Sequence, residues 1–218
     1  LFSLNYILAY RAQEHITSAL AAIAFSMILW MNIVLSRLVF GTRATPRVLV
    51  GAALGIVGVV VSFAPQVEVL SLGDSVLYGS SLAVAGALTA SFGNMVSQAA
   101  QKRALPVMQA NAWGMFYGAL ITAAVAVAGG HPFTFDATFT YIASLAYLAI
   151  FGSVIAFGAY LTLVGRIGAH RAGYAAVMWP VVALALSMAF EGLRLDAPII
   201  IGTSFVLLGN LLVLKRGA

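Results

Sequence analysis

Amide and hydroxyl side chains recur inside the apolar stretches of this sequence, where they could bind a polar solute. These residues are Asn5, Tyr6, Asn32, Asn94, Gln98, Asn111 and Asn210. An unsatisfied polar group is costly among apolar helices, so each is expected to face the interior of a helix bundle. A structural hydrogen bond to a neighbouring helix, worth about 0.6 kcal/mol, would explain any single one of these polar residues equally well. Asn94 and Gln98 lie one helical turn apart on one face, and two aligned amides indicate a wet surface.

Aromatic residues form a second group that could bind a ligand. Trp30, Tyr78, Trp113, Tyr117, Tyr160 and Trp179 lie deep in apolar stretches or beside polar residues. A pocket of a few aromatic faces and a few amides would bind an apolar or aromatic small molecule through contact and offset stacking. Core packing or contact with lipid explains the same residues equally well. The candidate substrate-binding residues are therefore Tyr78, Asn94, Gln98, Trp30, Trp113, Tyr117, Tyr160, Trp179 and Tyr6.

Catalytic and cofactor motifs are missing from the sequence. It has no His-Glu-x-x-His, no Gly-x-Ser-x-Gly and no phosphate-binding glycine-rich loop ending in Lys. The histidines, His15, His131 and His170, all lie between apolar stretches, and the chain has no cysteine to bind a metal or form a disulfide. The sequence predicts no enzyme, no cofactor and no metal site.

The amino-acid composition predicts that the candidate residues lie within a membrane protein. Hydrophobic residues make up 62% of the chain and charged residues 8%, whereas about a quarter of the residues of a soluble protein are charged. Most of the apolar stretches approach the twenty or so residues that a spanning helix needs. The predicted fold is an all-α membrane protein with eight helices: Leu1–Tyr10 (partial), Thr17–Ser36, Val48–Ala64, Ser75–Ala99, Val107–Ala128, Phe139–Val164, Ala172–Phe190 and Pro198–Leu214.

Charges between these stretches alternate in sign along the chain. One set of loops holds nine basic residues and no acid: Arg37, Arg43, Arg47, Lys102, Arg103, Arg166, Arg171, Lys215 and Arg216. The other set holds all six acids and two basic residues, Arg11 and Arg194. Basic residues favour the cytoplasmic side when loops are short, so both ends of this chain are predicted to be cytoplasmic. The net charge of +5 then reflects orientation in a lipid bilayer and predicts no nucleic-acid partner.

The stretch 156–211 reads as a second copy of 2–60. Tyr160 aligns with Tyr6, Trp179 with Phe25, Pro180 with Ser26, Gly202 with Gly51 and Gly209 with Gly58. By the charge count, equivalent loops of the copies lie on opposite sides of the membrane. Inverted repeats are typical of transporters whose two halves rock about a site near the middle of the membrane.

Glycine and proline carry structural roles in this repeat. Gly51, Gly55 and Gly58 follow a small-xxx-small pattern that allows close helix approach, and Gly202 and Gly209 repeat its outline. Internal packing is the favoured interpretation, leaving the protein a monomer, although Gly51-x-x-x-Gly55 could instead mediate a dimer. Pro180 is expected to bend its helix. Its counterpart Ser26 is expected to leave a straighter one, the pair forming hinges.

Both copies resemble the drug/metabolite transporter superfamily, in its EamA-type branch of ten helices. The likeness rests on ITSALAAIAFSMILWMNIVLSRLVFGTRATPRVLVGAALGIVGVVV and AHRAGYAAVMWPVVALALSMAFEGLRLDAPIIIGTSFVLLGNLLV. It implies two inverted repeats of five helices in one integral membrane domain. Residues 1–64 would hold the last three helices of the first repeat and 75–214 all five of the second. The first two helices would then be missing from this chain. Thr42 and Leu193 depart from the family's usual Glu.

The sequence and the resemblance together predict a transporter of small organic molecules in a bacterial plasma membrane. The family activity that suits these side chains best is export of amino acids, aromatic or hydrophobic ones in particular, by alternating access. Every acid falls in a loop, so movement is expected to be facilitated and not coupled to protons. Export of other amphipathic metabolites or drugs, and a membrane assembly subunit that transports nothing, remain alternatives.

Overall fold

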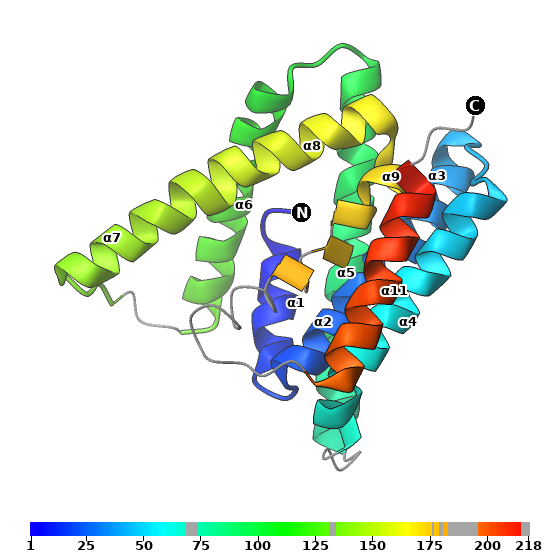
Figure 1. Ribbon diagram of the computed structural model, residues 1–218. Helices are drawn as coiled ribbons and strands as arrows, with labels where there is room; N and C mark the ends of the chain where they lie inside the picture. The colour runs from blue at the N-terminus through cyan, green and yellow to red at the C-terminus, as the bar shows by residue number, and fades with distance from the viewer. Residues whose placement is uncertain (69–73, 131–133, 176, 179–180, 183–195, 215–218) are drawn as a thin grey trace.

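The described residues of the computed structural model are 1–68, 74–130, 134–175, 177–178, 181–182 and 196–214, and they form helices without a strand (Figure 1). In chain order these are α1 (Leu4–Gln13), α2 (Ser18–Ser26), α3 (Ile28–Phe40), α4 (Pro46–Glu68), α5 (Asp74–Lys102), α6 (Val107–Ala128), α7 (Phe139–Tyr147), the π-helix η1 (Leu148–Ile155), α8 (Ala156–Ile167), α9 (Ala169–Ala172) and α11 (Ala197–Leu214). The expectation of an all-α membrane protein is confirmed.

Among the described residues, five helical stretches are long and apolar enough to cross a membrane. They are Leu20–Phe40, Pro46–Ala64, Asp74–Lys102, Val107–Ala128 and Phe139–Ile167, and Ala197–Val213 is a shorter apolar helix. The bounds predicted for Val107–Ala128 agree with those of α6. Most of the predicted helix Ala172–Phe190 lies outside the described residues, as do Trp179 and Pro180.

The helix around Ser26 is interrupted, where the sequence predicted a single straighter helix over Thr17–Ser36. α2 ends at Ser26 and α3 begins at Ile28. The hydroxyl of Ser26 donates to the carbonyl of Ile23 at 2.6 Å, and the N–H of Met27 bonds to Ala24 three residues back at 3.2 Å. A serine that bonds to the preceding turn competes with the regular helical ladder and can bend the helix. Because Pro180 lies outside the described residues, the expectation that the helix at Ser26 is the straighter of the two stays a prediction.

A π-helix divides the long span Phe139–Ile167. η1 occupies Leu148–Ile155, and the hydroxyl of Ser153 donates to the carbonyl of Leu148, five residues back, at 3.3 Å. π-Helical turns are rare and widen the backbone locally. No residue of α7 or η1 is buried, and this arm runs away from the bundle in Figure 1. Only the α8 end of the span turns back into the core.

α5 is the centre of the bundle, because α1, α2, α3 and α8 all pack along it. Its inner face is built from small residues: Gly79, Ala83, Gly86, Ala87, Ala90 and Ser91. Small side chains let neighbouring backbones approach closely in a membrane protein, where helix association depends on packing. α4 and α11 pack lengthwise on the other side and share a core around Val59 and Val206 (Figure 1).

Candidate functional site

Polar side chains from three helices meet inside the bundle. Asn32 comes from α3, Ser91 and Asn94 come from α5, and Tyr160 comes from α8. Ser91 Oγ donates to Asn32 Oδ1 at 2.5 Å, and Asn94 Nδ2 donates to Asn32 Oδ1 at 3.3 Å and to Tyr160 Oη at 3.0 Å. We call these four residues the amide cluster. It joins α3, which the sequence assigned to the first repeat, to α5 and α8 of the second.

Helical spacing explains why the cluster is buried. Ser91 and Asn94 are three residues apart, so they lie on the same face of α5. That face also carries Ala87 and Ala90, which are buried, and it is covered by α3 and α8. The exposed fractions of Asn32, Ser91 and Asn94 are 0%, 0% and 1%. Polar groups this deep need hydrogen-bond partners, because an unpaired one costs about 1–3 kcal/mol.

Two atoms of the cluster lack such partners. Asn32 Nδ2, a donor, and Asn94 Oδ1, an acceptor, are buried without a hydrogen bond. Exchanging the nitrogen and oxygen of both amides would preserve the bonds between the two side chains, and it would still leave one donor and one acceptor free. Asn5 Oδ1 on α1 and Asn111 Nδ2 on α6 are buried and unpaired as well. Among the described residues, α1, α3, α5 and α6 thus each carry a buried amide atom without a hydrogen bond.

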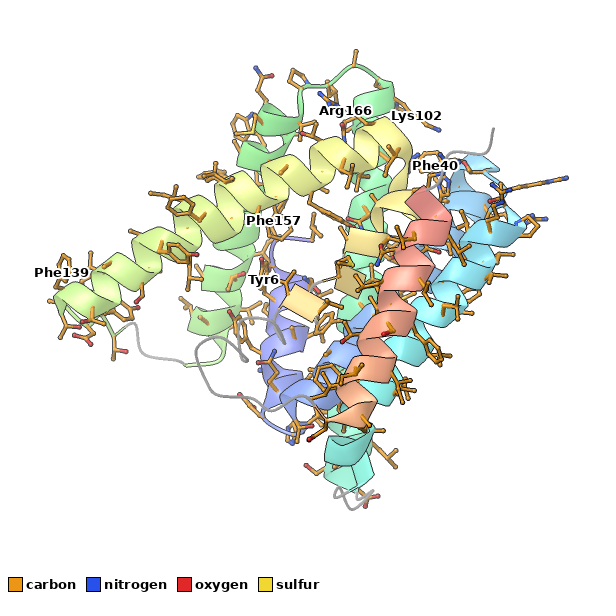
Figure 2. All side chains as sticks on the ribbon, in the orientation of Figure 1. Tyr6, Phe40, Lys102, Phe139, Phe157 and Arg166 are labelled. Carbon is orange, nitrogen blue, oxygen red and sulfur yellow. The ribbon has the colours of Figure 1, made fainter. Side chains whose placement is uncertain are left out.

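Aromatic rings of α1 and of the segment before it pack against α8. Tyr6 meets Phe157 edge to face with ring centroids 6.4 Å apart, and Phe2 meets Phe157 at 5.2 Å. Figure 2 labels Tyr6 on α1 and Phe157 on α8. Phe157 precedes Tyr160 by three residues and so shares its face of α8. These rings thus form an aromatic contact on the helix that also carries Tyr160.

Gln98 lies on the face of Asn94 as predicted, but its oxygen is already engaged. Gln98 Oε1 accepts the backbone N–H of Ala169 at 3.0 Å, where α8 gives way to α9. Gly168 makes that corner with φ +83°, a conformation that side chains rarely adopt. Gln101, one turn later, donates to the carbonyl of Leu161 at 2.7 Å. The two glutamines thus hydrogen-bond α5 to α8 and to the start of α9. Gln98 therefore has a structural role beside the cluster.

Several predicted site residues lie elsewhere. Tyr78 is 52% exposed and packs edge to face on His15, with centroids 5.2 Å apart. Trp113 and Tyr117 are 61% and 56% exposed and stack on each other along α6 at 5.8 Å. Trp30 packs partly buried against the core shared by α4 and α11. The structure therefore brings Asn94 and Tyr160 together. It places Tyr6 against Phe157, on the helix that also carries Tyr160, and it gives Tyr78, Trp113, Tyr117 and Trp30 contacts outside the cluster.

Sequence reasoning did not place Asn32, Ser91 or Phe157 in the site. Asn32 was noted as an amide within a span but not placed in the site, and Ser91 and Phe157 were not considered. A signal was present for two of them, because Ser91 precedes Asn94 by three residues and Phe157 precedes Tyr160 by three. Asn32 could not be paired with Asn94 by spacing, since the residues lie on different helices.

Charged residues gather at the two ends of the bundle, away from the cluster. Lys102 at the end of α5 sits over the ring of Phe40 at the end of α3, with Nζ 4.1 Å from the ring centroid. Figure 2 shows Lys102, Phe40 and Arg166 at this end. Asp74 begins α5, and 29 helical residues separate the two ends by about 43 Å. Among the described residues no group of His, Asp or Glu could hold a metal ion.

One histidine at the basic end is partly buried. His170 in α9 has its Nδ1 enclosed without a hydrogen bond, close to Gly168. Burial lowers the pKa of His170, and the positive charge of Arg171 lowers it further. The side chain is therefore held in its neutral form beside Gln98, at the corner that closes α8.

The chain is similar to known proteins in sequence and in fold. The model of a family described as the EamA-like transporter family matches residues 77–215 of the 218-residue chain. No curated protein matches. Seven chains of solved structures match. One of them, titled "Crystal structure of protein", has a TM-score of 0.82 and 17% identity, over 98% of this chain and 73% of that chain. At this identity the likeness shows the fold alone.

Proposed function

The chain belongs to the EamA-like transporter family, a family of membrane transporters of small molecules, and we propose that its substrates are amino acids with aromatic or hydrophobic side chains. We further propose that it exports them across a bacterial plasma membrane. The observation that carries the proposal is the amide cluster. It holds an unpaired donor and an unpaired acceptor. The helix α8, which carries Tyr160 of the cluster, also packs Phe157 against Tyr6 of α1, and such rings would suit an apolar side chain.

The packing of α4 on α11 supports an inverted repeat. Gly51 lies against Gly209, and Gly58 lies against Gly202. In the sequence alignment Gly51 corresponds to Gly202 and Gly58 to Gly209. Gly51 therefore contacts the counterpart of Gly58, and Gly58 contacts the counterpart of Gly51. Such reciprocal contacts are the pattern of a two-fold axis. They also show that the two helices run antiparallel. A two-fold axis between antiparallel helices suits two halves that rock about a central site, as alternating access requires.

The charge distribution supports movement without proton coupling. The described acids with visible side chains, Glu14, Asp74, Asp136 and Asp196, all sit at helix ends or in loops. A carrier that moves protons needs an ionisable group deep in the membrane that can take up and release one. The amide cluster offers only neutral groups. Facilitated movement down the substrate gradient therefore accords best with its chemistry, with both ends of the chain on the basic, cytoplasmic side.

Reconstitution tests this function. Proteoliposomes of the purified protein would be loaded with unlabelled tryptophan, phenylalanine or leucine, and exchange with the labelled amino acid outside would be measured against empty liposomes. We expect exchange above that control, with no added accumulation when a pH gradient is imposed. Flux no greater than in empty liposomes for every amino acid would refute the proposed substrates. Uphill accumulation driven by the pH gradient would refute facilitated movement.

A further inference from the structure

We propose that the end of the bundle where α3, α5 and α8 finish binds the head groups of anionic phospholipids. Exposed basic side chains gather at this end. We call them the basic surface, and they are Arg37, Arg43, Arg47, Lys102, Arg103 and Arg166. The inference concerns the lipid around the protein, so it does not depend on which molecule is transported.

Contacts between helix ends bring these residues to one end of the bundle. Lys102 Nζ lies 4.1 Å from the centre of the Phe40 ring, which joins the end of α5 to the end of α3 (Figure 2). Gln101 Nε2 donates to the carbonyl of Leu161 at 2.7 Å, which joins the end of α5 to α8. Leu161 lies five residues before Arg166. Basic residues from three separate parts of the sequence therefore belong to one surface.

The acids whose side chains are described lie away from the basic surface. Asp74 and Lys102 are the first and last residues of α5. Asp136 precedes the span whose last turn holds Arg166. The others are Glu14, which follows α1, and Asp196, which precedes α11. Among the described residues the basic side chains thus lack a carboxylate to compensate them, and cations gathered in this way attract anions.

Helix dipoles explain some of these basic positions but not all of them. Arg37, Lys102 and Arg166 lie in the last turns of α3, α5 and α8, where the helix favours a cation. Arg47 lies in the first turn of α4, which holds no acid. The helix dipole disfavours a cation in a first turn, so an anion bound beside Arg47 would compensate both charges.

Exposed apolar side chains beside the basic residues favour a lipid over a soluble anion. Leu38 and Val39 follow Arg37, and Val50 follows Arg47 by three residues; all three apolar side chains are more than half exposed. They lie where one spanning stretch ends and the next begins. A phospholipid offers its phosphate to the arginines and its acyl chains to these apolar side chains. A soluble anion would meet only the first condition.

Lipid titrations test this inference. The purified protein in a neutral detergent would be titrated with phosphatidylglycerol, with phosphatidylcholine of the same acyl chains, and with inorganic phosphate, and its melting temperature would be followed. We expect phosphatidylglycerol to reach its half-maximal effect at a concentration at least about fivefold lower than phosphatidylcholine, with the difference shrinking at high salt. Equal effects of the two lipids would overturn the inference. Inorganic phosphate that reproduced the effect of phosphatidylglycerol would overturn it in favour of a soluble anion.

Single substitutions locate the binding. Arg43→Gln and Arg47→Gln should each raise the concentration of phosphatidylglycerol needed for the half-maximal effect by about fivefold, the contribution expected of one basic residue near a membrane surface. Arg47→Lys should retain most of the effect. Arg11→Gln is the matched control, because Arg11 is also exposed in a last helical turn but lies beside Glu14. Wild-type titrations of both Arg43→Gln and Arg47→Gln, or an equal loss in Arg11→Gln, would refute the inference.

Discussion

Gly58 of α4 faces Gly202 of α11 so closely that a Cβ atom at Gly58 would lie 2.5 Å from the carbonyl oxygen of Gly202. A Cβ at Gly51 would similarly lie 2.7 Å from the carbonyl oxygen of Gly209. Contacts this short are made against backbone, which cannot rotate away. The contact surface between α4 and α11 therefore admits only a hydrogen atom as the side chain at these positions.

Adding a methyl group to this contact surface should destabilise the protein. Gly58→Ala and Gly202→Ala are each expected to lower the free energy of unfolding by about 1–3 kcal/mol, since overpacking forces the helices apart. Gly86→Ala on α5 is the control, because its Cβ would meet Asn5 at an ordinary 3.5 Å. Thermal unfolding in detergent provides the measurement. Equal melting temperatures for Gly58→Ala and Gly86→Ala would contradict the packing described.

Gln98 is expected to matter for stability and not for the choice of ligand. Gln98→Ala removes the acceptor of the buried Ala169 N–H, which should cost about 1–3 kcal/mol. Gln109→Ala, at an exposed position on α6, is the control. Melting temperature and the binding of labelled phenylalanine would both be measured. Weaker phenylalanine binding by a folded Gln98→Ala protein would show that Gln98 touches the ligand, as the sequence had predicted.

The partial burial of His170 predicts a loss of stability in mild acid. Its pKa in the folded protein is below the ordinary value of 6.5. As pH falls through 6.5, the unfolded chain therefore takes up a proton that the folded protein resists, and the free energy of unfolding decreases. His170→Gln should reduce the difference in melting temperature between about pH 7.5 and pH 5.5. An unchanged difference in the variant would exclude His170 as the cause.

Orientation in the membrane can be tested with single cysteines, because the chain has none of its own. A cysteine at Lys102 should be shielded from an impermeant thiol reagent applied outside intact cells, whereas one at Asp136 should react. Both positions are exposed to solvent on the protein surface, so accessibility within the fold does not differ. Labelling of the Lys102 position from outside would reverse the proposed orientation.

The helices could be predicted because their signal is local. Apolar runs of about twenty residues located α4, α5, α6 and the long span from Phe139, and the charges between them marked the helix ends. The interruption at Met27 escaped prediction because it depends on how the Ser26 hydroxyl bonds to Ile23. A serine at that place fits a regular helix equally well.

The site was only partly predictable because it is built across helices. Asn94 and Gln98 do share a face of α5, yet the structure directs Gln98 to the corner at Ala169. Trp113 and Tyr117 share a face of α6 too, but that face is exposed. Spacing along one helix shows which residues share a face of that helix. It does not show which face is buried by a neighbouring helix, because that depends on the tertiary packing.

If the amide cluster binds the transported molecule, removing the side chain of Asn94 should slow counterflow. Proteoliposomes of the wild-type protein, Asn94→Ala and Thr89→Val would be loaded with unlabelled phenylalanine and exposed to labelled phenylalanine outside; Thr89→Val is the control, because the Thr89 hydroxyl donates to the Gly86 carbonyl of its own helix. We expect accumulation of label by the wild type and Thr89→Val, and at least about a tenfold lower initial rate for Asn94→Ala, the loss expected from about 1.4 kcal/mol of missing interaction. Wild-type counterflow in a correctly folded Asn94→Ala protein would contradict it.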